Sequence, residues 1–160
     1  MRQDEDGLPR GSTTLPLGEQ LEFMRLLWAI DHRLQTHSKK MASSLGVTGP
    51  QRLVIRIVGR FPGVSAGQLA WTLHLDPSTL TGILRRLERA GLLTRRRDPR
   101  DRRRAVLGLS AAGRRLDVTT GGTIESVMDQ VLDRLPRRKL QVARAVLGAI
   151  AEGFDGGSAP

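Results

Sequence analysis

Seven arginines are concentrated in one ten-residue segment, 95–104, which has the sequence RRRDPRDRRR. Together with its two aspartates they leave the segment with a charge of +5. Guanidinium groups bind phosphate oxygens well and are attracted into narrow, negative minor grooves of DNA. The segment therefore predicts a contact to nucleic acid. The residues expected to make or shape that contact are Arg100, Asp101, Arg102 and Arg103.

The aspartates and the proline inside this segment indicate a folded turn. Asp98 followed by Pro99 favours a turn, and Asp101 is expected to pair with a neighbouring arginine and hold the tip in shape. The flanking stretches 92–97 and 102–110 carry apolar residues suited to two short strands. A β-hairpin with a basic tip is thus predicted, and the alternative is a disordered basic loop that binds any polyanion.

A second group of residues suited to DNA lies just before this hairpin, on a helix predicted over 76–90. Asp76 is expected to cap it, Pro77 fits its first turn, and Gly91 ends it. At about 100° per residue, its leucines and Ile83 share one face. The opposite face has short polar side chains followed by arginines, which lets a helix approach base edges and pair with guanine or phosphate. The candidate contacts on this face are Ser78, Thr79, Gly82, Arg85 and Arg86.

The helix at 76–90 follows a shorter predicted helix, 65–75, after a tight connection, which is the helix-turn-helix pattern. A helix-turn-helix followed by a two-stranded hairpin is a winged helix. Another helix is predicted from Thr48, a candidate N-cap, to Gly59. Thr48, Gln51 and Ser65 are expected to bind the DNA backbone. Trp71 is expected to pack in the core, with packing against the wing or lining a pocket as the alternatives.

Composition supports a nucleic-acid partner. The 160-residue chain has a net charge of +10, and such a surplus points to a polyanion. It has no cysteine, which excludes disulfides, thiolate metal sites and thiol sensors. We find no apolar run of the length that a membrane span needs and no signal-peptide core, so a cytoplasmic protein that does not bind membranes is expected. No metal site and no cofactor are expected, and no residue pattern indicates an enzyme.

The fold class expected is mainly α with a small β-hairpin wing. We expect a flexible leader at 1–16, a long amphipathic helix at 17–46, the winged helix-turn-helix domain at 47–110, C-terminal helices within 111–153 and a flexible tail at 154–160. The C-terminal part is predicted as one helix over 110–135, doubtful at Gly121-Gly122, and a second after Pro136. The terminal helices have broader apolar faces than one small domain can bury, so they are expected to form a homodimer. The residues expected in that interface are Leu21, Met24, Trp28, Val131, Leu135, Leu140, Leu147 and Ile150.

From about residue 45 to 115 the chain resembles the MarR family (multiple antibiotic resistance regulators). The matching stretches are LGVTGPQRLVI and GQLAWTLHLDPSTLTGILRRLERAGLLTRRRDPRDRRRAVLGLSAAGRRL. The Asp-x-Arg of the family's wing corresponds to Asp101 and Arg103, and the strand that leaves the wing corresponds to Leu107, Leu109 and Ser110. Gly82 departs from the pattern, because longer side chains are usual there.

The resemblance implies a homodimeric regulator of transcription, with a repressor expected, that binds a palindromic operator in double-stranded DNA. It also implies a small anionic or aromatic effector in the crevice between the dimer helices and the DNA-binding lobe. The residues leave two alternatives open. One is an architectural protein that binds nucleic acid without regard to sequence; the other is an enzyme, or a winged helix used only as a protein scaffold.

Overall fold

The computed structural model describes residues 15–99, 101 and 104–156. The expected leader (1–14 of it), the last four residues of the tail, and Arg100, Arg102 and Arg103 lie outside the described residues. The elements, in chain order, are α1 (Gly18–Leu45), α2 (Gly49–Arg60), α3 (Ala66–Leu73), α4 (Pro77–Arg89), β1 (Leu93–Arg97), β2 (Ala105–Leu109), α5 (Ala111–Leu116), α6 (Ile124–Leu132) and α7 (Arg137–Gly156). The expected class, mainly α with a two-stranded hairpin, is confirmed.

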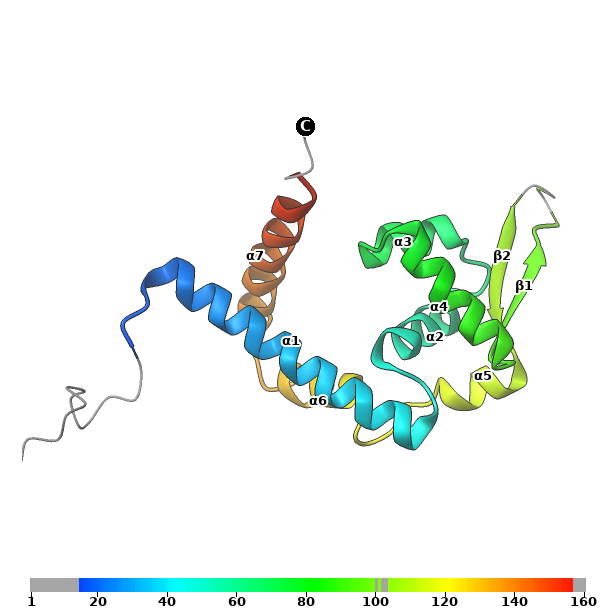
Figure 1. The fold of residues 1–160 in the computed structure, drawn as a ribbon, viewed down its shortest axis with the longest axis horizontal. Coiled ribbons are helices and arrows are strands. Elements are labelled where there is room, and N and C mark those ends of the chain that lie inside the picture. The colour runs from blue at the N-terminus through cyan, green and yellow to red at the C-terminus, as the bar shows by residue number, and fades with distance from the viewer. Residues whose placement is uncertain (1–14, 100, 102–103, 157–160) are drawn as a thin grey trace, which may run out of the picture.

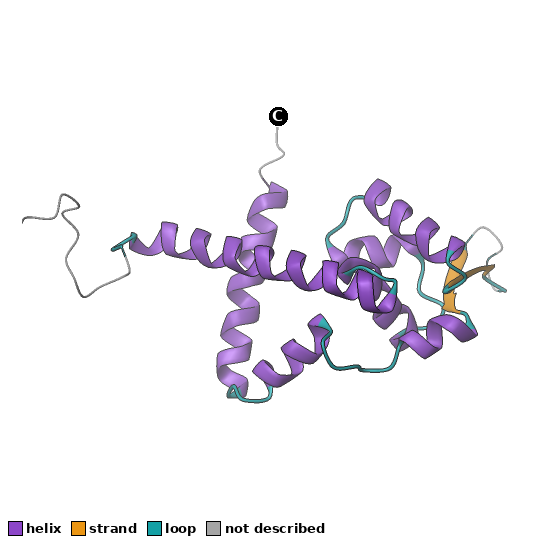
Figure 2. Ribbon diagram, turned by 60° about the horizontal axis from the view of Figure 1, so that its bottom comes forward, coloured by secondary structure: helices purple, strands orange, loops and turns teal. Residues whose placement is uncertain are grey.

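The elements form two lobes (Figure 1). Helices α2 to α5 and the hairpin make one lobe, and α1, α6 and α7 make the other. Helix α7 crosses α1 at a steep angle in both views (Figures 1 and 2). Phe23 of α1 and Val142 and Val146 of α7 line one apolar hollow at this crossing. In the described part of the chain, no helix is both long and apolar enough to cross a membrane.

The core belongs to the lobe with the hairpin, and it is aliphatic. It is built where the apolar faces of α2, α3 and α4 meet the inner face of the hairpin. Its buried members are Val47, Val54, Ile55, Val58, Leu69, Leu80, Ile83, Leu84, Leu87, Leu93 and Leu107. Burying aliphatic side chains of this kind contributes about 1.5–3 kcal/mol each, so this core fixes the helices relative to the hairpin.

Helix ends in this lobe follow the sequence closely. Thr48 and Ser65 form capping boxes with Gln51 and Gln68 at the starts of α2 and α3. Ser110 caps α5. The expectation for Asp76 is only half right: it holds the N-cap position of α4, but its side chain makes no capping hydrogen bond. Pro77, whose fixed φ suits the first turn, starts the helix there.

The single helix predicted over 110–135 is wrong, because the structure has two. Helix α5 ends at Leu116, and α6 begins only at Ile124. Gly122 has a φ of +78°, a backbone conformation that favours glycine, and Thr123 then caps α6. At the C-terminus, α7 extends to Gly156 and so includes the first residues of the segment 154–160.

The hairpin is antiparallel, with Leu93 opposite Leu109 and Arg97 opposite Ala105. Its strands are shorter than the predicted ranges 92–97 and 102–110. Beyond the last pair, the Asp98 N–H donates to the carbonyl of Arg104 at 2.9 Å. Ser65 forms an isolated bridge with Val106. The segment before α3 therefore lies beside β2 and ties the hairpin to the helices.

Candidate nucleic-acid interface

Helix α4 is positioned by a short connection from α3. His74 ends α3 with a φ of +48°, and its N–H donates to the carbonyls of Ala70 and Trp71. The chain then enters α4 at Asp76 and Pro77. Leu80, Ile83, Leu84 and Leu87 are buried against the core, as the helical period predicts. The opposite face of α4 is therefore turned outward.

That outward face carries the polar groups expected to contact DNA. Ser78, Thr79, Arg85 and Arg86 are exposed. Within the described part of the chain no carboxylate bonds to Arg85 or Arg86, so both guanidinium groups are available to an outside acceptor. A Cβ built on Gly82 would meet no heavy atom within 4 Å. The face is thus open where a DNA groove would have to approach closely.

The hairpin is attached to α4 by an ion pair. Arg95 Nε of β1 donates to Glu88 Oε1 of α4 at 2.8 Å. Arg96 and Arg97, further along β1, are exposed. Asp101 is exposed, and its carbonyl accepts from the N–H of Arg104 at 2.9 Å. The pair between Arg95 and Glu88 holds the basic hairpin beside the outward face of α4, so both can meet one surface.

The three residues expected on the DNA backbone also act as helix caps. Thr48 Oγ1 accepts from the Gln51 N–H at 3.5 Å, and the Thr48 N–H donates to Gln51 Oε1 at 2.9 Å. Ser65 Oγ accepts from the Gln68 N–H at 3.2 Å. The hydroxyl hydrogens and the Gln51 amide nitrogen are the donors left for a phosphate.

A cluster of charges that sequence reasoning missed joins α2 to the segment between α5 and α6. Arg52 is buried; its Nε donates to Glu125 Oε1 at 2.5 Å, and its Nη1 and Nη2 donate to the carbonyls of Leu116 and Val118. Arg56, one turn on, pairs with the carboxylate of Asp117 at 2.8 Å. The sequence did contain a signal for this cluster. Arg52 lies three residues before Ile55, and this spacing places the arginine on the apolar face of α2. This cluster, which we call the arginine clamp, fixes the DNA-binding lobe to α6.

Comparison with known proteins supports these features. A family model, described as MarR family, matches residues 47–105, which span α2 to the start of β2. The organic hydroperoxide resistance transcriptional regulator of Bacillus subtilis is 30% identical over 128 residues, covering 78% of this chain and 86% of that protein. An HTH-type transcriptional repressor of Mycobacterium tuberculosis is 29% identical, covering 69% of this chain and 79% of that protein. The chain belongs to the MarR family.

Solved structures agree with this MarR-family assignment. The complex of S. aureus MepR with DNA has the same fold, with a TM-score of 0.67 at 20% identity, covering 82% of this chain and 97% of that one. The PcaV transcriptional regulator of Streptomyces coelicolor, in complex with its natural ligand, has a TM-score of 0.65 at 26% identity. This match covers 88% of this chain and 98% of that one. This MarR-family chain is a DNA-binding transcriptional regulator with a winged helix-turn-helix, and it is not an enzyme.

The expected interface residues of this MarR-family chain lie on the second lobe. No residue of α6 is buried, and none of α7 between Arg137 and Phe154. Most of the expected residues are exposed: Leu21, Met24, Trp28, Val131, Leu135 and Leu147. Leu140 and Ile150 are half-buried. So many large apolar side chains in water indicate a surface that another chain covers.

Core packing was expected for Trp71, and this prediction is wrong. Trp71 is 84% exposed, the most exposed of the large apolar side chains in the described residues. Leu69, two residues earlier on α3, fills the core position instead, because that side of the short helix faces α2 and α4. Trp71 borders a hollow with Phe61 and Gln68 on the outside of the lobe.

Proposed function

We propose that this MarR-family chain acts in the cytoplasm as a homodimeric, effector-responsive repressor that binds a palindromic operator. One observation carries the proposal: α4 buries four apolar residues, and its other face presents serine, threonine, an open glycine position and arginines that pair with no carboxylate of the described residues. Such a helix fits the major groove, where base edges differ in their donors and acceptors.

The hairpin adds a second contact. With α4 in the major groove, the ion pair of Arg95 with Glu88 directs the arginine-rich tip along the same side of the DNA. Arg100, Arg102 and Arg103 would then reach the adjacent minor groove or its phosphates, with Asp101 keeping the tip folded. Thr48, Gln51 and Ser65 would bind phosphates, which fix the register of the protein but carry no sequence information.

The dimer follows from the uncovered apolar surface of α1, α6 and α7. A second copy related by a two-fold axis would bury Leu21, Met24, Trp28, Leu147 and their neighbours. It would also bring two copies of α4 to half-sites about one helical turn apart. This symmetry is the reason for expecting a palindromic operator.

Regulation by a small effector is supported by the similarity to PcaV, which was solved with its natural ligand. An effector can lower DNA affinity only if it binds more tightly to a state that does not fit the operator. We propose that this effector is a small anionic or aromatic molecule.

The test replaces Arg86, which is expected to contact the edge of a DNA base. Arg86→Ala should weaken binding to the operator by about 1–3 kcal/mol and relax the preference at one base pair. Arg33→Ala removes the same charge from an exposed site on α1, in the other lobe, and should leave the preference among sequences unchanged. If Arg86→Ala also leaves that preference unchanged, Arg86 is not a base reader. A wild-type protein that binds all sequences equally would instead support the architectural alternative.

A further inference from the structure

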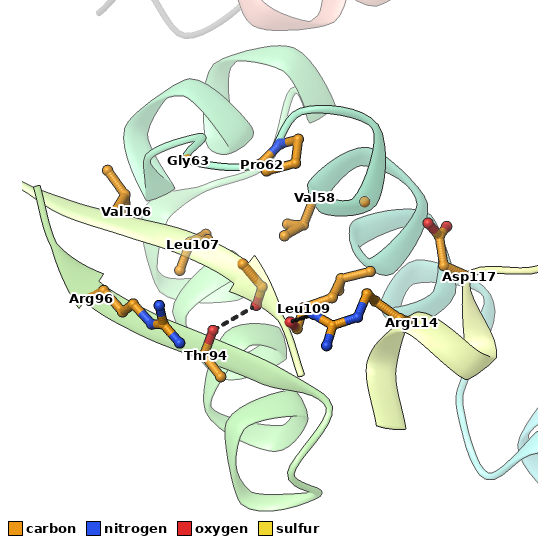
Figure 3. Close-up of a pocket in the computed structure, with 12 residues that line it drawn as sticks. Val58, Pro62, Gly63, Thr94, Arg96, Val106, Leu107, Leu109, Arg114 and Asp117 are labelled. Atoms are coloured by element: carbon orange, nitrogen blue, oxygen red, sulfur yellow. Dashed lines mark hydrogen bonds between the residues drawn. The ribbon is translucent and has the colours of Figure 1, made fainter. Parts of the chain in front are cut away.

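A second group of cations lies at the turn from α6 to α7, apart from the arginines of the DNA-binding lobe such as Arg96 and Arg114 (Figure 3). The hairpin extends upward in Figure 1, whereas this turn lies below α1, on the other side of the molecule. Figure 2 also shows the turn well away from the hairpin. The cations, which we call the basic turn, are Arg134, Arg137, Arg138 and Lys139. A duplex that contacts α4 and the hairpin would therefore lie on the wrong side to neutralise them.

No carboxylate neutralises the basic turn within the chain. All four side chains are exposed, and none bonds to a carboxylate of the described residues. Segment 133–139 holds these four cations and one carboxylate, Asp133, which leaves a charge of +3. The positions three and four residues after the cations of α7 are Leu140, Gln141, Val142 and Ala143. Ion pairs between successive turns of α7 are therefore not available to them.

Helix α7 also begins with its cations at the unfavourable end. Three of them lie in its first turn, and that turn has no acidic residue. The N-terminus of a helix carries a partial positive charge, so cations there weaken the helix and an anion there stabilises it. The residue before α7 is Pro136, whose side chain has no oxygen to cap the free N–H groups. The positive charge of the basic turn is thus left for an outside anion to neutralise.

We propose that the basic turn binds the phosphate backbone of a second DNA duplex, so that one protein joins two duplexes. Three of its four cations are arginines, whose planar guanidinium groups bind phosphate oxygens in a bidentate way. Because the chain is a DNA-binding regulator, duplex DNA is the polyanion it meets where it acts. The contact should not depend on base sequence, because phosphates carry no sequence information. This role goes beyond the proposed function, which concerns a single operator.

A capture assay tests the second contact without any operator. One duplex of arbitrary sequence is fixed to beads, the full chain is added, and a labelled duplex of another sequence is captured from solution. The variant R134Q/R137Q/R138Q should capture the labelled duplex at least about tenfold more weakly than the wild type, because three phosphate contacts are lost. Its matched control, R33Q/K39Q/K40Q, removes the same charge from exposed sites on α1 and should capture as the wild type does. Both variants should bind a single duplex equally well.

Salt should weaken the capture by the wild type, because each phosphate contact releases about one counterion. If three arginines each contact one phosphate, the expected loss is about 40-fold between 50 and 200 mM salt. Because no operator is used, a chain that binds all sequences equally would contradict the proposed function and leave these expectations unchanged.

Three results would overturn the second contact. The first is a wild type that binds the fixed duplex and captures no labelled one. The second is equal capture by R134Q/R137Q/R138Q and its control, since two copies of α4 would then hold separate duplexes. The third is a monomeric R134Q/R137Q/R138Q in analytical ultracentrifugation, because the basic turn would then pair with a second copy of the chain. Vesicles of phosphatidylglycerol that bind the wild type, with no labelled duplex captured, would assign the basic turn to a membrane surface instead.

Discussion

Removing the guanidinium of Arg52 should destabilise the fold strongly. The side chain is 2% exposed, and its partner Glu125 is 23% exposed. Arg52→Met keeps the packing of the stem, but it leaves a half-buried carboxylate without its cation and the carbonyls of Leu116 and Val118 without their donor. Breaking a buried pair by removing one partner costs about 3–5 kcal/mol. Because water can reach part of Glu125, we expect a loss near the low end, about 3 kcal/mol in the free energy of unfolding.

Urea unfolding followed by circular dichroism measures this loss, at one fixed protein concentration because the stability of a dimer depends on it. Arg56→Met is the matched control: its side chain is 34% exposed, and its pair with Asp117 should contribute only about 1 kcal/mol. Adding Glu125→Gln to Arg52→Met should recover part of the loss, because no unpaired charge then remains. If Arg52→Met and Arg56→Met each lower the free energy of unfolding by only about 1 kcal/mol, the arginine clamp does not join the lobes as a buried ion pair would.

Three further substitutions test the helices and the interface. Gly82→Ala should raise the unfolding free energy by about 0.5–1 kcal/mol, since the added methyl meets open space; a lower Tm in a thermal scan would contradict this. Ser65→Ala should lower the free energy of unfolding by about 1 kcal/mol, because the N-cap of α3 is lost. Urea unfolding measures this change, and an unchanged midpoint would show that the cap does not stabilise the fold. Leu147→Asp should convert the dimer to a folded monomer in analytical ultracentrifugation, and a mass that stays dimeric would place Leu147 outside the interface.

The DNA-binding lobe was largely predictable, because its signals are local. The spacing of Leu80, Ile83, Leu84 and Leu87 gave the buried face of α4, and the exposed polar face follows from it. Thr48, Ser65 and Ser110 marked the helix starts. Each of these depends on residues within one or two helical turns, which a single sequence contains.

What the sequence did not show depends on long-range contacts. The break between α5 and α6 is held by Arg52, which reaches carbonyls 64 and 66 residues away in the chain. The helical period predicted one helix across this break, with Gly121-Gly122 as its doubtful point, because apolar spacing continues on both sides of it. The prediction for Trp71 failed for a related reason. An apolar residue type does not determine which way its side chain points, and the side of α3 that faces the core is set by α2 and α4.

Recognition of a particular DNA sequence is the function that the exposed face of α4 implies. It is tested most directly by fluorescence anisotropy of the protein on DNA from upstream of its own coding region and on a scrambled copy, over a series of salt concentrations. The upstream fragment should bind about 10³-fold or more tightly than the scramble. The scramble should bind near 10⁻⁴–10⁻⁶ M, with a steep dependence on salt. Equal affinity for the upstream fragment and the scramble at every salt concentration would contradict the claim that α4 recognises a site there.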